Sequence, residues 1–183
     1  MRMLTCLALA FCVITGSACS DQSKVSGASD DILVIETKNG KVLVKLRPDL
    51  APKHVERVKT LAKEGFYNGI KFHRVIPDFM AQTGDPTGTG QGGSNYGDLP
   101  AEFSQEPFKR GSVGAARTSD PNSANSQFFM CFTDGGCSSL NGQYTIWGQV
   151  IEGMDKIDQV AKGEPPAIPD VMEKVYLQSD EKK

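Results

Sequence analysis

Between residues 72 and 150 the apolar residues come in short runs, and Gly, Pro, Asn or Asp separates each run from the next. Such runs predict short β-strands joined by glycine-rich loops, as in a β-barrel or a sandwich. Because helical patterns do not alternate with these runs, a parallel doubly wound sheet is disfavoured. With the flanking segments, the pattern predicts about eight strands and two main helices.

The segments on either side of this region carry clear local signals. Residues 32–46 hold two β-rich runs around the pair Asn39-Gly40, a strong hairpin signal. Residues 51–66 place apolar side chains on one helical stripe, with Pro52 in the first turn and Gly65 at the end. The remaining expected elements are a helix over residues 151–163, a proline-rich link over residues 164–170 and a strand over residues 171–177.

The N-terminal residues have the plan of a secretory signal. Arg2 precedes an apolar run over residues 4–14, and small residues follow at positions 16–18. A buried N-terminal helix or strand is the alternative. We therefore predict four segments: a signal peptide over 1–19, a flexible polar tether over 20–30, one folded domain over 31–178 and a charged tail over 179–183.

Cys19 leaves the type of signal open. Bacterial lipoproteins are cut before a cysteine that follows small residues, but such sites usually carry an aliphatic residue where this chain has Gly16. An ordinary signal peptidase would also cut after Ala18 and leave Cys19 unmodified. Both readings predict an exported, periplasmic protein, either soluble or anchored by a lipid on Cys19.

Charge and cysteine content exclude several classes of function. The net charge of −2 leaves no basic excess for nucleic acid, and no stretch after residue 20 is apolar enough to span a bilayer. Cys131 and Cys137 lie six residues apart without clustered histidines, so a zinc site is not predicted. An exported protein permits a disulfide between them, but we expect two free, partly buried thiols.

Common catalytic motifs are absent from the sequence. It contains no G-x-S-x-G elbow, no H-E-x-x-H pair and no Walker loop. His54 falls in the first turn of the expected helix, where a solvated side chain is the default. Residues 88–93, GTGQGG, match G-x-G-x-x-G, but Gly97 and Pro100 follow where a dinucleotide site needs a helix. We expect a flexible loop beside a peptide groove and no cofactor.

The stretch FHRVIPDFMAQTGD, residues 72–85, sets a cation and an amide among apolar side chains. A strand over residues 72–76 would place Arg74 on one face, and a second strand from Phe79 would place Met80 and Gln82 on a common face. An isolated buried cation is costly, so Arg74 must be paired or functional.

Two carboxylates could supply a purely structural partner for Arg74. Asp85 and Glu102 are the candidates, and an edge-strand ion pair with either would explain the arginine without any function. On this stretch alone the structural and the functional interpretations stay open.

Three longer blocks favour the functional interpretation. FHRVIPDFMAQTGD, GSVGAARTSDPNSANSQFFM and SLNGQYTIWGQV together resemble the cyclophilins, a family of peptidyl-prolyl cis-trans isomerases, and its bacterial branch in particular. The resemblance runs from about Ile32 to Leu177. It implies an all-β fold, a closed eight-stranded antiparallel β-barrel capped by two α-helices.

The resemblance also implies roles for individual residues. Arg74 matches the key catalytic arginine, and His73 matches the histidine beside it. The remaining matches are a proline pocket of Phe79, Met80, Phe129 and Leu140, contacts to the peptide from Gln82, Ala116 and Gln127, and a groove loop with Gly90 and Gln91. We group Arg74, Phe79 and Gln82 as catalytic. The others, with Tyr144, are grouped as substrate-binding.

Two positions depart from the family pattern. Ser139 stands where an aromatic residue, often Trp, usually precedes the pocket leucine, and Tyr144 stands where a histidine is frequent. The expected substrates are proline-containing polypeptides, handled by a monomer with no metal. The alternative is a non-catalytic proline-peptide binder or chaperone that uses the same groove, while a hydrolase lacks a nucleophile–base pair.

Overall fold

The computed structural model describes residues 31–181, so the predicted signal peptide, the tether and Cys19 lie outside the described residues. The helices are α1 (Pro52–Lys63) and α2 (Met154–Ile157), with short 3-10 turns η1 (Ser138–Leu140) and η2 (Gln178–Asp180). The strands are β1 (Ile32–Thr37), β2 (Gly40–Leu46), β3 (Ile70–Lys71), β4 (Arg74–Ile76), β5 (Met80–Thr83), β6 (Ser112–Ala115), β7 (Phe128–Cys131), β8 (Ile146–Glu152), β9 (Val171–Met172) and β10 (Lys174–Leu177).

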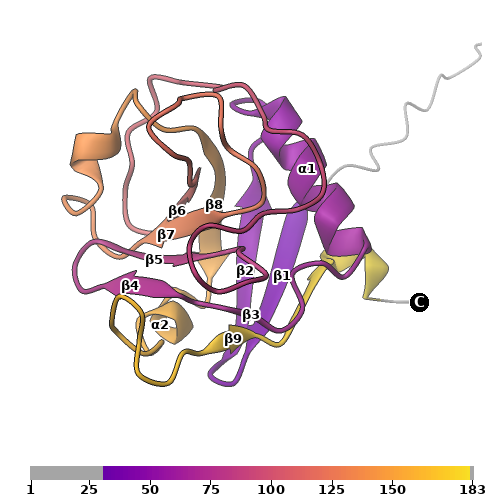
Figure 1. Ribbon diagram of the computed structural model, residues 1–183, viewed down its shortest axis with the longest axis vertical. Helices are drawn as coiled ribbons and strands as arrows, with labels where there is room; N and C mark the ends of the chain where they lie inside the picture. Colours follow the sequence, from indigo (N-terminus) through magenta and orange to yellow (C-terminus); the bar gives the residue numbers. More distant parts are fainter. Residues whose placement is uncertain (1–30, 182–183) are drawn as a thin grey trace, which may run out of the picture.

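Eight of these strands form one curled antiparallel sheet in the order β10-β1-β2-β8-β6-β7-β5-β4 (Figure 1). The closed barrel that we expected is not confirmed, because β4 and β10 are the two edges and do not pair with each other. The chain just before each edge strand forms a separate ladder instead: β3 pairs with β9, Ile70 opposite Met172. The outer edge of β4 meets Gly163 through a single bridge at Val75, so the main sheet stays open.

The predicted hairpin is confirmed, with its turn one residue earlier than Asn39-Gly40. Thr37 pairs with Gly40, which leaves Lys38 and Asn39 as the turn residues. Gly40 has φ of 127°, a backbone conformation that residues other than glycine rarely adopt. Glycine is therefore needed at the first position of β2.

Helix α1 also follows the prediction. It starts at Pro52, buries the apolar stripe of the helix, and ends just before Gly65, whose φ is 70°. His54, however, is only 3% exposed, so the prediction of a solvated side chain is wrong. Its Nδ1 lies 2.6 Å from Glu102 Oε2, and the backbone N–H groups of Lys53 and His54 donate to the same carboxylate.

The physical reason is the missing cap at the start of α1. Ala51 precedes the helix and offers no side chain to accept its free N–H groups. The Glu102 carboxylate replaces that cap from far along the chain, and a negative group is favourable there. This arrangement pulls His54 inward, and burial lowers the pKa of its imidazole although Glu102 opposes the shift.

The second helix is much shorter than residues 151–163. Ile151 and Glu152 complete β8, and the helix spans only Met154–Ile157. Gly153 separates the two with φ of 84° in the left-handed region, which ends the strand and starts the helix in a new direction. In Figure 1, α1 and α2 lie at different ends of the curled sheet.

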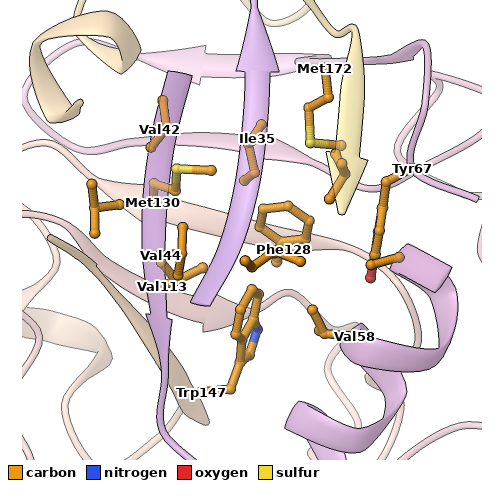
Figure 2. Close-up of a cluster of buried hydrophobic side chains, with 14 of the residues drawn as sticks. Ile35, Val42, Val44, Val58, Tyr67, Val113, Phe128, Met130, Trp147 and Met172 are labelled. Carbon is orange, nitrogen blue, oxygen red and sulfur yellow. The ribbon is translucent and has the colours of Figure 1, made fainter. Parts of the chain in front are cut away.

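The main core lies between the curled sheet and α1 (Figure 2). Phe128 is its centre: the ring packs edge-on against Tyr67 and Trp147, with centroid distances of 5.6 and 5.3 Å. A second buried cluster consists of Met80, Phe108, Phe129, Cys131, Cys137 and Ile146. Within residues 31–181, no helix has the length and apolar character needed to cross a membrane.

Candidate active site

Strand pairing brings the key predicted residues into one row. Arg74 of β4 lies opposite Gln82 of β5, Gln82 lies opposite Phe129 of β7, and Phe129 lies opposite Gly114 of β6. Cross-strand partners share one face of a sheet, so a guanidinium, an amide and an aromatic ring follow one another on that face. A Cβ at Gly114 would come within 2.5 Å of the Phe129 ring, so the absence of a side chain there makes room for the ring.

The tight connection between β4 and β5 sets this register. Pro77 and Asp78 interrupt the apolar run as predicted, and Asp78 takes φ of 62°. Ile76 then pairs with Met80. The sequence FHRVIPDFM thus folds into a short hairpin whose two strands carry Arg74 and Met80 to the same site.

An apolar pocket of about 110 Å³ opens beside this row. Phe129 packs against Phe108 at 5.6 Å and against the Tyr144 ring at 5.9 Å between centroids. The pocket is lined by Arg74, Phe79, Met80, Gln82, Ala116, Arg117, Phe129, Leu140 and Tyr144. All of these except Arg117 are residues that the sequence predicted.

A second, more polar cavity of about 330 Å³ continues from the pocket and shares Gln82, Ala116 and Arg117 with it. Gln82 Nε2 donates to Gln127 Oε1 at 2.9 Å. Gln127 Nε2 in turn donates to the backbone oxygens of Gly90 and Gly92 at 3.0 and 2.8 Å. The predicted residues Gly90, Gln91 and Gln127 therefore lie together along the second cavity.

Asp85 organises the glycine-rich loop over residues 86–93. Its carboxylate is 1% exposed and accepts hydrogen bonds from the backbone N–H groups of Thr87, Thr89 and Gly90 at 2.7, 3.0 and 2.6 Å. Burial alone would raise the pKa of Asp85, but the hydrogen bonds from Thr87 and from the loop backbone outweigh it and lower the pKa to about 2. The sequence suggested a flexible loop. In the structure, hydrogen bonds to Asp85 hold the loop backbone.

Arg74 lies at the rim of the pocket with 41% of its side chain exposed, because β4 is the edge of the sheet. Its Nε donates to Glu164 Oε2 at 2.7 Å. Neither carboxylate considered from the sequence is the partner, since Asp85 holds the loop and Glu102 holds the start of α1. The picture of an arginine buried among apolar residues is therefore corrected: the cation borders the apolar pocket and faces solvent.

His73, which we expected to bind substrate, is buried. It lies in the wall of a third cavity of about 570 Å³ that also includes Arg74, Gly90 and Glu164. Burial lowers the pKa of the imidazole, which favours its neutral form at pH 7. The His73 ring lies beside Gly90 of the loop, 3.8 Å from the position that a Cβ would take there.

Sequence reasoning missed two residues at the site. The Arg117 guanidinium stacks 4.2 Å from the centre of the Tyr144 ring and donates to Thr118 O and Gln143 O at 2.8 and 2.9 Å. Arg117 follows Ala116 directly, so its position in the same block was an available signal. Glu164 gave none, because it lies 90 residues from Arg74 in the chain.

Cys131 and Cys137 form a disulfide, so the expectation of two free thiols is wrong. Both are completely buried, and their Cα atoms lie 6.1 Å apart, within the usual range for such a bond. The chain leaves β7 at Cys131 and turns back over Phe79, which returns Cys137 to the strand end. The bond ties β7 to the segment that carries Leu140, while Ser139 beside Leu140 is exposed.

These features together define a class of protein. A small pocket lined mainly by apolar side chains adjoins a cavity lined by amide and backbone groups, and the Arg74 guanidinium borders the pocket. Residues 31–181 contain no group of three or more His, Cys, Asp or Glu side chains that could hold a metal ion. The fold and the site are those of a peptidyl-prolyl cis-trans isomerase.

The comparisons with known proteins identify the family. The model of the cyclophilin-type peptidyl-prolyl cis-trans isomerases matches residues 32–178. A Brucella suis protein named "Probable peptidyl-prolyl cis-trans isomerase" is 50% identical over 177 residues, covering 88% of this chain and 89% of its own. A peptidyl-prolyl cis-trans isomerase of Helicobacter pylori is 39% identical over 149 residues, covering 79% of this chain and 85% of its own.

Solved structures agree with this result. A cyclophilin from Hirschia baltica superposes with a TM-score of 0.76 at 28% identity, covering 84% of this chain and 76% of its own. A Cryptosporidium parvum cyclophilin solved in the presence of the dipeptide Ala-Pro gives a TM-score of 0.73 at 30% identity, covering 80% of this chain and 98% of its own. The chain belongs to the cyclophilin family, and its activity is peptidyl-prolyl cis-trans isomerisation.

Proposed function

We propose that the 110 Å³ pocket holds the proline ring of the substrate and that Arg74 is the catalytic residue. The observation that carries this proposal is the row in which Arg74, Gln82 and Phe129 lie side by side across three strands. Phe129, Met80 and Phe79 offer the ring an apolar contact surface. The adjoining cavity with Gln82, Ala116 and Gln127 takes the residues that precede the proline.

The chemistry needs neither a nucleophile nor a cofactor. Rotation about a peptide bond crosses a barrier of ~18–20 kcal/mol, because conjugation gives the C–N bond partial double-bond character. Twisting the X-Pro bond breaks this conjugation and returns the lone pair to the prolyl nitrogen. A guanidinium N–H of Arg74 can donate to that lone pair, which the planar amide does not offer, so the twisted state is favoured over both isomers.

The pocket and the groove hold the two sides of the rotating bond apart. The ring is fixed by apolar contacts, whereas the preceding residue is fixed by hydrogen bonds. Arg74 is suited to its role because its guanidinium group is a rigid planar fork of N–H donors. A bound peptide would cover the exposed side of Arg74, and loss of water strengthens its hydrogen bond to the substrate.

We also propose that the protein acts outside the cytoplasm, in the periplasm, as a monomer that assists the folding of exported proteins. The signal pattern of residues 1–19 supports the location, and the Cys131–Cys137 disulfide is of the kind that persists in oxidising compartments. Contact with a membrane would come only through a lipid on Cys19.

The binding mode is tested by NMR titration of the protein with an Ala-Pro peptide and with a matched Ala-Ala peptide. The dipeptide in the Cryptosporidium parvum structure makes Ala-Pro the natural probe. We expect the Ala-Pro peptide alone to shift the signals of Met80, Phe129 and Leu140. The Phe129→Ala variant should lose this response. Equal shifts with both peptides, or shifts confined to other parts of the protein, would contradict the proposal.

A further inference from the structure

Glu164 lies on the opposite side of Arg74 from Gln82. The backbone of Gly163 exchanges two hydrogen bonds with Val75, from Val75 N to Gly163 O at 2.8 Å and from Gly163 N to Val75 O at 2.9 Å. This bridge is antiparallel, so the residue before Val75 faces the residue after Gly163. Arg74 and Glu164 are therefore cross-strand neighbours, and the row at the site extends from Gln82 through Arg74 to Glu164.

The segment that carries Glu164 is shaped for this bridge. Gly163 has φ of 147°, and a Cβ there would lie 2.7 Å from Pro166 Cα and 2.9 Å from Pro165 O. Glycine is therefore required at the bridge. Pro165 and Pro166 follow Glu164 and restrict the backbone on its other side. The carboxylate is thus attached to β4 by the backbone and does not depend on a freely moving loop.

The hydrogen bond from Arg74 Nε to Glu164 Oε2 uses the inner nitrogen of the guanidinium. Within residues 31–181 it is the one hydrogen bond that the Arg74 side chain makes, so both terminal NH₂ groups stay available. Arg74 lines the apolar pocket on one side and the cavity with Glu164 on the other. A carboxylate on Nε fixes the plane of the fork while leaving its outer edge for the substrate.

An ion pair this exposed contributes little to the stability of the fold. Glu164 is 52% exposed and Arg74 is 41% exposed, and pairs of this kind have small measured effects. The pair at the pocket rim therefore affects the orientation of the Arg74 guanidinium more than the stability of the fold.

We propose that Glu164 is a positioning residue for isomerisation, which acts by holding the Arg74 guanidinium in the orientation that reaches the prolyl nitrogen. The proposal rests on the catalytic role of Arg74 proposed above. A guanidinium released from Glu164 would sample other rotamers, and loss of orientation lowers the rate of the chemical step rather than the affinity for the peptide.

The test compares Glu164→Ala, Glu164→Gln and Arg74→Ala with Asp158→Ala as the matched control. Asp158 pairs with Arg110 at 2.6 Å and similar exposure, away from the pocket. We expect Glu164→Ala to lower kcat about tenfold with little change in KM, as a fraction of the loss of about 10²–10³ that removal of the whole donor causes. Glu164→Gln should recover part of the rate, because the amide oxygen still accepts from Nε. Asp158→Ala should keep the wild-type rate.

The double variant Arg74→Ala/Glu164→Ala separates the two proposals. If Glu164 acts through Arg74, removing it in the Arg74→Ala background changes nothing further. A wild-type or raised kcat in Glu164→Ala, with Arg74→Ala inactive, would overturn the positioning role alone. A second, additive loss in the double variant would also overturn it. Full activity in Arg74→Ala would overturn the catalytic role of Arg74, and the positioning role with it.

Discussion

Arg74 and Asp85 both lie in residues 72–85 but have different roles in the structure. Arg74 is on an edge strand and borders a pocket, and no group of residues 31–181 bonds to its two terminal NH₂ groups. Asp85 is buried, and its carboxylate oxygens accept hydrogen bonds from the backbone of the glycine-rich loop. The sequence alone permitted these two residues to pair with each other. The hairpin directs them away from each other, since Arg74 bonds to Glu164 and Asp85 bonds to residues 87–90.

At this scale we predict that Asp85→Asn destabilises the protein at pH 7 by about 2 kcal/mol, from the lowering of its pKa from 3.8 to about 2. The folded state binds the proton of Asp85 more weakly than the unfolded state does. Its contribution is therefore complete above pH ~4 and is lost as the pH falls towards 2. Urea unfolding of wild type and variant at several pH values measures the difference.

The control for this prediction is Asp155→Asn, which removes an exposed carboxylate paired with its neighbour Lys156. It should leave the free energy of unfolding nearly unchanged. A stability difference between wild type and Asp85→Asn that is as large at pH 2 as at pH 7 would contradict the assignment.

At the scale of elements, local signals were sufficient wherever the cause of a structure was local. Pro52 and Gly65 mark the ends of α1, and the pair Asn39-Gly40 marks the first hairpin, so both were predicted from sequence. The failures have other causes. Helix α2 starts late because the left-handed Gly153 ends β8 there, and His54 is buried where the distant Glu102 caps α1. The edge strands β4 and β10 do not pair, which local sequence signals did not indicate.

The disulfide is an element-scale feature with a consequence for the pocket. It joins the end of β7 to the segment before η1, and Leu140 of η1 is one wall of the pocket. We predict that Cys131→Ala/Cys137→Ala is less stable by about 2 kcal/mol, the loop-closure contribution for so short a loop. We also expect a KM for proline peptides that is a few times higher, because the Leu140 wall is no longer tied to β7.

Urea unfolding and peptide isomerisation kinetics of this double variant test both parts. Reduction of the wild type with a dithiol, which splits the bond into two thiols, should reproduce the effect. Unchanged KM and unchanged stability in the double variant would show that the bond neither supports the pocket nor stabilises the fold.

At the scale of the whole molecule, the sequence indicated which residues would lie together at the candidate site, but it did not indicate that the sheet stays open. The predicted residues Phe79, Met80, Phe129 and Leu140 come together in one pocket, because long motifs specified them. The sequence did not indicate that His73 is buried or that Glu164 pairs with Arg74. Local residue spacing predicts neither the burial of one side chain nor a partner 90 residues away. Both positions depend on how distant segments pair in the folded chain.

The chain as a whole carries one prediction about its location. In its native host the protein should be cut between Ala18 and Cys19 and recovered from the periplasm. Mass spectrometry of the mature N-terminus distinguishes a lipid-modified Cys19 from a free one. A protein that retains Met1 in that host would contradict both forms of the export proposal.

The central claim is that Arg74 favours the twisted X-Pro bond from the rim of the proline pocket. NMR exchange spectroscopy on an Ala-Pro peptide measures this most directly, with wild type, Arg74→Ala and Arg74→Lys compared at equal concentration. We predict that Arg74→Ala lowers the catalysed exchange rate by about 10²–10³, that Arg74→Lys restores little of it, and that both variants unfold at the same temperature as the wild type. Wild-type exchange by a folded Arg74→Ala protein would contradict the account.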